Sequence, residues 1–188
     1  MIINIIGDCD KRPVLYTVMK ICQRLGDVLL VSSSSRLMRL SDTRVSFGHY
    51  QNTMIAVTLD GIDDFWEEYQ YSSDDFDFVI IDNIVTAEAD LTIYVKGMIE
   101  SEFEKDMIEY IEDVKTIDLY KNKLVGGTTL MRCEEFEALR NMCTIGQGVA
   151  EAVAKIMAGA LGKEVKNIYN IAMSDTNTRK QKSGFGKG

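Results

Sequence analysis

The N-terminal segment constrains the fold more than any other part of the chain. Ile2–Ile6 is a mainly apolar segment typical of a buried strand, and Gly7 ends it. Apolar residues then recur every three to four positions, with Pro13 in the first turn and Gly26 just past the end, which are helix start and stop signals. Val28–Val31 is a second buried-type strand. This order predicts a crossover between parallel strands.

The same alternation continues along the chain. The polar stretch 43–59 predicts two short strands around Gln51 and Asn52. Further expected elements are the strands Phe76–Asp82, Leu91–Val95 and Lys123–Val125, the helices Asp63–Tyr71 and Gln147–Leu161, and a helix with the inner stripe Phe103, Met107, Tyr110, Ile111 and Val114. The pattern therefore predicts an α/β fold of three layers, P-loop or Rossmann-like, with a mainly parallel sheet and helices on both faces.

With 188 residues, the chain is long enough for one domain with a single hydrophobic core. We expect residues 1–173 to form this domain, because no linker divides them. Residues 174–188 are polar and offer nothing to bury, so we expect a flexible basic tail. Its basic residues are Arg179, Lys180, Lys182 and Lys187.

Negative charge is concentrated in the middle of the sequence. The whole chain has a net charge of −8, but Asp60 to Asp113 contains 18 acidic residues against Lys96 and Lys105 alone, a local charge of −16. The remainder carries +8. This distribution predicts a strongly acidic face, suited either to solvation or to a basic partner. It disfavours nucleic acid as a ligand, except through the basic tail.

The cysteines do not indicate a metal centre. Cys9, Cys22, Cys133 and Cys143 lack the spacing of a zinc site, and His49 is the only histidine. We expect reduced cysteines that pack as structural residues, and an exposed His49 without a catalytic partner. The sequence shows neither a signal peptide nor an apolar run of about 18 residues, so we expect a cytoplasmic protein without a membrane span.

Ligands of parallel α/β sheets bind at the carboxyl ends of the strands. Three segments of this sequence follow strands and are rich in polar groups: 7–13 after the first strand, the serines Ser32–Ser35 after the second, and Asp82-Asn83 after the clearest strand. These segments contain the candidate functional residues.

The chain resembles the MinD/ParA family of deviant-Walker P-loop ATPases over about residues 1–125. The resemblance is carried by the first strand running through Gly7 into a helix, by Phe76–Asp82 ending in a carboxylate, and by Ala89–Val95 soon afterwards. Members of this family partition DNA or position cell machinery, and related members help to localise pili and secretion apparatus. The resemblance implies a nucleotide face that is also a dimerisation face.

The phosphate-binding loop of that family is degenerate in this sequence. Such a loop needs G-x-x-x-x-G-K-[ST], because small residues let backbone N–H groups surround the phosphates while the lysine and the hydroxyl handle charge and magnesium. Counted from Gly7, Arg12 replaces the second glycine, Pro13 the lysine and Val14 the hydroxyl residue. The family's additional lysine corresponds to Asp8. We therefore expect neither ordinary ATP binding nor hydrolysis.

The leading interpretation is a catalytically silent relative of these ATPases, acting as an interaction or positioning component of a bacterial assembly of the DNA-partition, pilus, secretion or conjugation type. It would need no metal and no cofactor, and it would form a homodimer or a heterodimer with an active relative. The expected interface or vestigial ligand site comprises Gly7, Asp8, Asp10, Lys11, Arg12, Ser32, Asp82 and Asn83.

In a second interpretation the carboxylates are catalytic, because their order is similar to that in magnesium-dependent haloacid-dehalogenase-type phosphotransferases. Asp8 would be the nucleophile and Asp10 the general acid and base. Ser32 or Ser33 would anchor phosphate, and Asp82 would join the two aspartates around Mg²⁺. Two further alternatives are a phosphoacceptor receiver with Asp82 as acceptor beside Asp8 and Asp10, and a plain interaction module. In a purely structural interpretation, Asp8 and Asp10 cap the first helix and Asp82 holds a turn.

Overall fold

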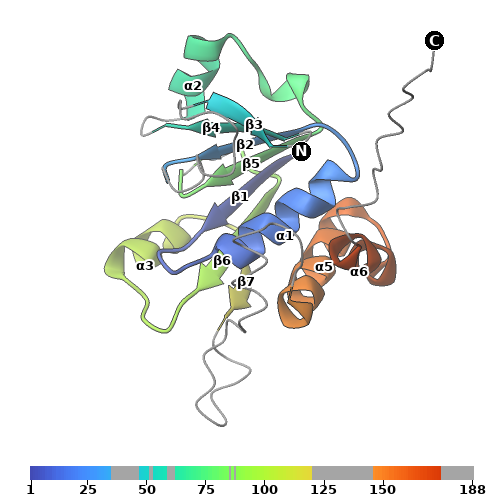
Figure 1. The fold of residues 1–188 in the computed structure, drawn as a ribbon. Helices are drawn as coiled ribbons and strands as arrows, with labels where there is room; N and C mark the ends of the chain where they lie inside the picture. The colour runs from blue at the N-terminus through green and yellow to red at the C-terminus, as the bar shows by residue number, and fades with distance from the viewer. Residues whose placement is uncertain are drawn as a thin grey trace, which may run out of the picture.

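The computed structural model describes residues 1–34, 47–50, 53–58, 62–84, 86, 88–119 and 146–174. Figure 1 shows these residues as a twisted sheet between two groups of helices. The strands are β1 (Ile2–Ile6), β2 (Val28–Ser32), β3 (Phe47–Tyr50), β4 (Thr53–Val57), β5 (Phe78–Asp82), β6 (Leu91–Lys96) and β7 (Lys115–Asp118). The helices are α1 (Arg12–Gln23), α2 (Ile62–Tyr69), α3 (Glu102–Glu109), α5 (Gln147–Leu161) and α6 (Val165–Met173), and Ser73–Asp75 forms a 3₁₀ turn.

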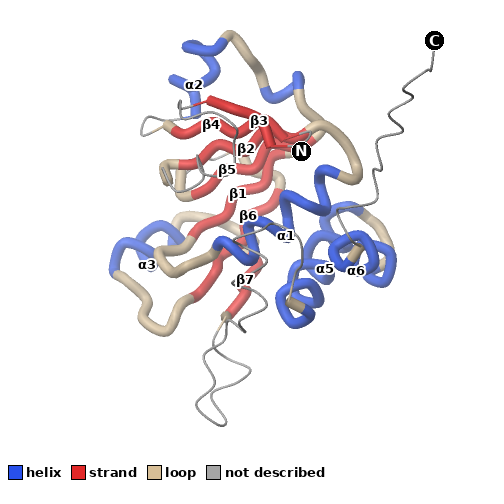
Figure 2. Tube along the Cα trace, in the orientation of Figure 1, coloured by secondary structure: helices blue, strands red, loops and turns tan. Residues whose placement is uncertain are grey.

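The described strands form one seven-stranded sheet in the order β3-β4-β2-β5-β1-β6-β7 (Figure 2). All neighbouring strands are parallel except β3 and β4, which form an antiparallel hairpin at one edge. The fold is therefore the three-layer α/β architecture with a mainly parallel, Rossmann-like sheet, as the alternation of strands and helices predicts. The two short strands predicted around Gln51 and Asn52 are β3 and β4.

The larger core lies between the sheet and the helices α1, α5 and α6. Alternate residues of β1, including Ile3 and Ile5, face this side and are fully buried. Helix α5 brings small residues such as Ala150 and Ala154 against α1, where their short side chains allow close packing. Cys22 lies within this core, which confirms its expected structural role.

The opposite face of the sheet is covered by α2 and α3 (Figure 1). Phe65 of α2 is fully buried against a smaller apolar cluster from β2, β4 and β5. Its ring lies 5.2 Å from that of Trp66 and 4.9 Å from that of Tyr69, measured between centroids. Both ring contacts lie within α2, and it is the burial of Phe65 against the strand cluster that fixes this acidic helix on the sheet.

The structure corrects several details of the sequence interpretation. Helix α3 ends at Glu109, so Tyr110, Ile111 and Val114 do not belong to its inner stripe, and Tyr110 is 84% exposed. The strand β7 and the helix α6 were not predicted. The expected strand Lys123–Val125, Cys133, Cys143 and the basic tail from 175 onwards lie outside the described residues, as does the side chain of His49.

A membrane-spanning helix would need a long apolar stretch. Within the part of the chain that the structure describes, every helix is too short or too polar for this.

Candidate functional site

The polar segments that follow β1, β2, β5 and β6 meet at one edge of the sheet. Strand β1 lies between β5 and β6, while its crossover through α1 leads to β2 on the far side of β5. The loop after β1 and the loop after β5 therefore run in opposite directions from the carboxyl ends of these strands. Parallel α/β sheets form ligand crevices at such a point. Most candidate residues of the sequence analysis lie in these loops or at the strand ends, and Arg12 is the first residue of α1.

Lys11 is the central side chain of this crevice. Its stem lies in the turn just before α1, and its ammonium donates to the backbone oxygen of Gly7 over 2.8 Å. The same Nζ atom lies 2.9 Å from Oδ1 of Asp82. Both side chains are buried, with exposed fractions of 7% and 6%. The ammonium thus points back beneath the loop and neutralises the carboxylate at the end of β5.

Asp82 is engaged on its second oxygen by the hydroxyl of Ser32, which donates over 2.5 Å. Because Ser32 ends β2 beside β5 in register with Asp82, strand pairing places the two side chains together. The Ser32 hydroxyl oxygen also accepts a hydrogen bond from the backbone N–H of Ser34 at 3.0 Å. Lysine, aspartate and serine therefore form a continuous buried network.

Asn83 connects the end of β5 to the end of β1 through two hydrogen bonds with the backbone of Gly7. Its side-chain oxygen accepts from the Gly7 N–H, and its side-chain nitrogen donates to the Gly7 oxygen, both at 3.1 Å. Asn83 has a positive φ of 57°, a conformation that asparagine tolerates better than most residues. Gly7 has a φ of 150°, and a Cβ there would lie 2.4 Å from the backbone oxygen of Val95.

The loop after β1 is also tied to the start of α3. The Glu104 carboxylate accepts from the Asp8 N–H and from the Ser101 N–H, each at 2.8 Å. The Ser101 hydroxyl donates to the Asp8 carboxylate at 2.7 Å, and its oxygen accepts from the Glu104 N–H at 3.1 Å. The capping box of α3 is thus shared with the first crossover. Asp8 does not cap α1 as one interpretation expected, because its carboxylate is turned towards α3.

Asp10 forms a two-point ion pair with Arg12. The Arg12 Nε donates to the carboxylate over 2.6 Å, and Nη2 contacts its other oxygen. This hydrogen-bonded pair raises the pKa of Arg12 above its ordinary value. The Asp10 carboxylate also accepts from the first N–H of α1 at 3.4 Å. Since Pro13 has no N–H, little of the helix N-terminus is left to bind an anion.

Cys9 lies between the first crossover and the end of β6. Its thiol donates to the backbone oxygen of Val95 over 3.3 Å. Burial, and then the nearby carboxylate of Glu104, raise the pKa of this thiol to about 11. The side chain is half-buried and stays protonated at neutral pH, so it has the character of a packing residue rather than a nucleophile.

A cavity of about 230 Å³ remains above these contacts. Its described lining contains three carboxylates against two cationic groups: Asp8, Asp10, Asp82, Lys11 and Arg12. Among these described groups, Lys11 and Arg12 are already paired with Asp82 and Asp10, and the Asp8 carboxylate leaves a net negative charge. A cavity with this balance is unsuited to a triphosphate.

The three aspartates proposed for a magnesium site have different partners: Ser101 for Asp8, Arg12 for Asp10 and Lys11 for Asp82. Across the residues that the structure describes, no group of three or more His, Cys, Asp or Glu side chains has the arrangement of a metal site.

Sequence reasoning located the crevice but missed two of its members. Ser101 and Glu104 are separated by the spacing of a capping box before an apolar stripe, a visible signal for a helix start. That signal does not reveal the contact with Asp8, because Glu104 lies 96 residues further along the chain.

A scan against models of protein families gave no match for this chain, and a search of curated proteins gave none either.

Proposed function

We propose that the protein is a catalytically silent member of the MinD/ParA type, acting in the cytoplasm as a binding or positioning component of a bacterial assembly. The observation that carries the proposal is the Lys11 ammonium. It takes the position of a cation between the Gly7 oxygen and the Asp82 carboxylate, and both contacts are buried. The groups that would handle a metal or phosphate are therefore satisfied within the chain.

The local backbone supports the same proposal. A phosphate cradle depends on N–H groups that point into an open loop. Here the Gly7 N–H is bound by Asn83 and the Asp8 N–H by Glu104. A triphosphate would have to displace both acceptors and approach a lining whose described residues include more carboxylates than cations.

Titration calorimetry with ATP, ADP and GTP in the presence of Mg²⁺ tests this proposal. We expect no binding heat at millimolar nucleotide, because the loop offers no free cation and few free N–H groups. Affinity in the micromolar range would overturn the proposal. Turnover of p-nitrophenyl phosphate that is lost in Asp8→Asn would instead support the magnesium-dependent phosphotransferase.

The surface beside the crevice supports the dimer that the resemblance implies. The loop after β6 packs on the first crossover, since a Cβ on Gly97 would lie 2.8 Å from the Cβ of Cys9. Its two following residues, Met98 and Ile99, are 70% and 84% exposed. Glu100 holds the loop by accepting from Tyr94 at 3.1 Å, and burial together with this contact raises the pKa of Tyr94. Adjacent exposed apolar side chains on a fixed loop suit a protein contact.

Ile99→Asp is expected to weaken self-association by at least about tenfold, because it places a charge in the centre of the proposed interface. Light scattering and sedimentation equilibrium over a range of concentrations would measure this change. Val165→Asp is the matched control, since Val165 is an exposed apolar residue on α6, on the other side of the sheet. A wild-type protein that stays monomeric at all concentrations would contradict a homodimer, and mixing with an active relative would then test the heterodimer.

A further inference from the structure

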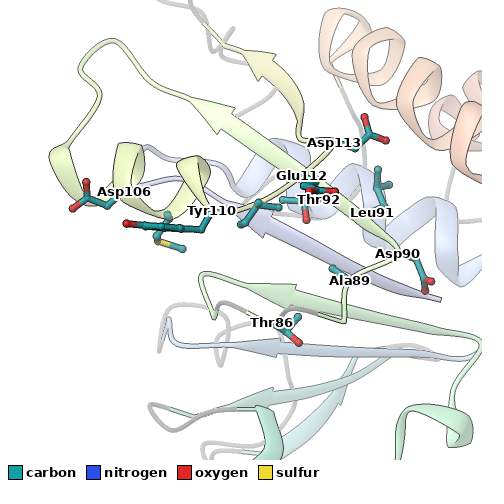
Figure 3. A pocket seen from close by; sticks show the side chains of 11 residues that line it. Thr86, Ala89, Asp90, Leu91, Thr92, Asp106, Tyr110, Glu112 and Asp113 are labelled. Atoms are coloured by element: carbon teal, nitrogen blue, oxygen red, sulfur yellow. The ribbon is translucent and has the colours of Figure 1, made fainter.

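A second and larger cavity lies near the amino end of β6, away from the crevice at the carboxyl ends of the strands. It has a volume of about 840 Å³ and opens between α3 and the start of β6. Figure 3 shows Asp106 and Tyr110 at one end of it, and Asp90 and Asp113 at the other. The described lining residues are Thr86, Ala89, Asp90, Leu91, Thr92, Asp106, Met107, Tyr110, Ile111, Glu112 and Asp113.

The lining combines an apolar part with acidic groups. Leu91, Met107 and Ile111 supply aliphatic surface, and the Tyr110 ring is 84% exposed beside them. The lining contains four carboxylates but, among its described residues, neither lysine nor arginine. An apolar floor between carboxylates is complementary to a segment that carries both apolar and basic side chains.

The acidic groups differ in their availability. Asp90 accepts from the backbone N–H of Ile2 at 2.7 Å, and Asp113 pairs with Lys115. Within the described part of the chain, no hydrogen bond or ion pair engages the carboxylates of Asp106 and Glu112, and both residues are exposed. These two carboxylates are therefore free to pair with cations brought by a partner.

We infer that this cavity binds a basic amphipathic segment of another protein, with apolar side chains on the floor and Lys or Arg beside Asp106 and Glu112. The inference rests on the proposed function in one respect, namely that the protein acts by binding other proteins. It does not depend on the crevice, which lies at the carboxyl ends of the strands. It also assigns a role to part of the acidic stretch between Asp60 and Asp113.

The test uses the full-length protein and a fluorescent helical peptide of about fifteen residues built from Leu and Lys at amphipathic spacing. Fluorescence anisotropy should show saturable binding that weakens as salt is added, since ionic strength screens the charge pairs. A peptide with Glu in place of each Lys should not bind. Tyr110→Ala should weaken binding by at least about tenfold, because aromatic anchors dominate such contacts. This variant is expected to fold, because Tyr110 is exposed.

Charge-matched variants separate a specific site from general attraction. Asp106→Asn/Glu112→Gln should weaken peptide binding about tenfold, whereas Glu67→Gln/Glu68→Gln on the exposed side of α2 should change it less than twofold. Equal losses in both double variants, or no effect of Tyr110→Ala, would overturn the inference. Tighter peptide binding after removal of residues 175–188 would also overturn it, because the chain's own basic tail would then be the occupant. A change in self-association in Tyr110→Ala would identify a second copy of the chain instead.

The outcomes also separate this inference from the proposed function. Failure of the peptide to bind, with calorimetry still showing no nucleotide binding, would reject the docking site alone. Micromolar ATP affinity together with peptide binding that depends on Tyr110 would reject the silent crevice and keep the docking site.

Discussion

Replacing Lys11 by methionine is expected to lower the free energy of unfolding by about 3 to 5 kcal/mol, the usual cost of removing one partner of a buried ion pair. Methionine keeps most of the apolar stem but removes the ammonium, so the Asp82 carboxylate is left buried with Ser32 as its remaining hydrogen-bond donor. The Gly7 oxygen also loses a donor. Urea denaturation followed by circular dichroism would measure the loss.

A second substitution shows whether the uncompensated charge is the cause. Asp82→Asn introduced into Lys11→Met removes the orphaned charge and keeps an oxygen that can accept from Ser32. The double variant should therefore be more stable than Lys11→Met alone, with a coupling free energy of about 1 to 3 kcal/mol. Lys105→Met on the exposed side of α3 is the control for loss of a lysine, and its effect should stay within about 0.5 kcal/mol. An equal, small effect of both lysine variants would show that the Lys11 pair contributes nothing.

Gly7→Ala is expected to destabilise the protein by about 2 to 6 kcal/mol, since a strained backbone costs about 1–3 kcal/mol and overpacking a similar amount. The new Cβ would lie 2.4 Å from the backbone oxygen of Val95, which belongs to β6, a strand paired on both sides, and cannot move aside alone. The positive φ of 150° at Gly7 is also unfavourable for alanine. Thermal and urea unfolding would measure both effects together.

Gly159→Ala is the matched control, because it makes the same chemical change inside helix α5. No described atom lies within 4 Å of a Cβ at that position. Alanine has the higher helix propensity, so we expect a gain of about 0.5 to 1 kcal/mol. A neutral effect of Gly7→Ala would mean that the first crossover rearranges easily, and it would weaken the case for a rigid, closed crevice.

Much of the fold could be predicted from local patterns. The predicted strands at Ile2–Ile6, Val28–Val31 and Phe76–Asp82 are mostly apolar, with Asn4 and Asp77 as their internal polar residues, as expected for strands covered on both faces. Helix α3 contains Phe103 and Met107 of the predicted stripe, but the prediction continued the helix too far, to Val114. Tyr110 and Ile111 continue its apolar spacing, yet the chain turns after Glu109 and enters β7. Spacing alone does not mark where packing ends a helix.

The candidate site was likewise predictable in part from the sequence. Because Ser32, Asp82 and Asn83 end neighbouring strands, a parallel sheet requires them to share an edge, and the sequence predicted their proximity. The contacts of the Lys11 ammonium were not predictable. The same local backbone allows the side chain of a loop lysine to point into solvent or into the crevice.

The amino-acid sequence alone determines the order of strands and helices and the absence of a G-x-x-x-x-G-K-[ST] pattern after the first strand, because both are properties of neighbouring positions. Only the tertiary structure decides that Lys11 neutralises Asp82, that Glu104 holds the loop after β1, and that Tyr110 borders an acidic cavity. These contacts join residues far apart in the chain, and their formation depends on how the helices pack on the two faces of the sheet.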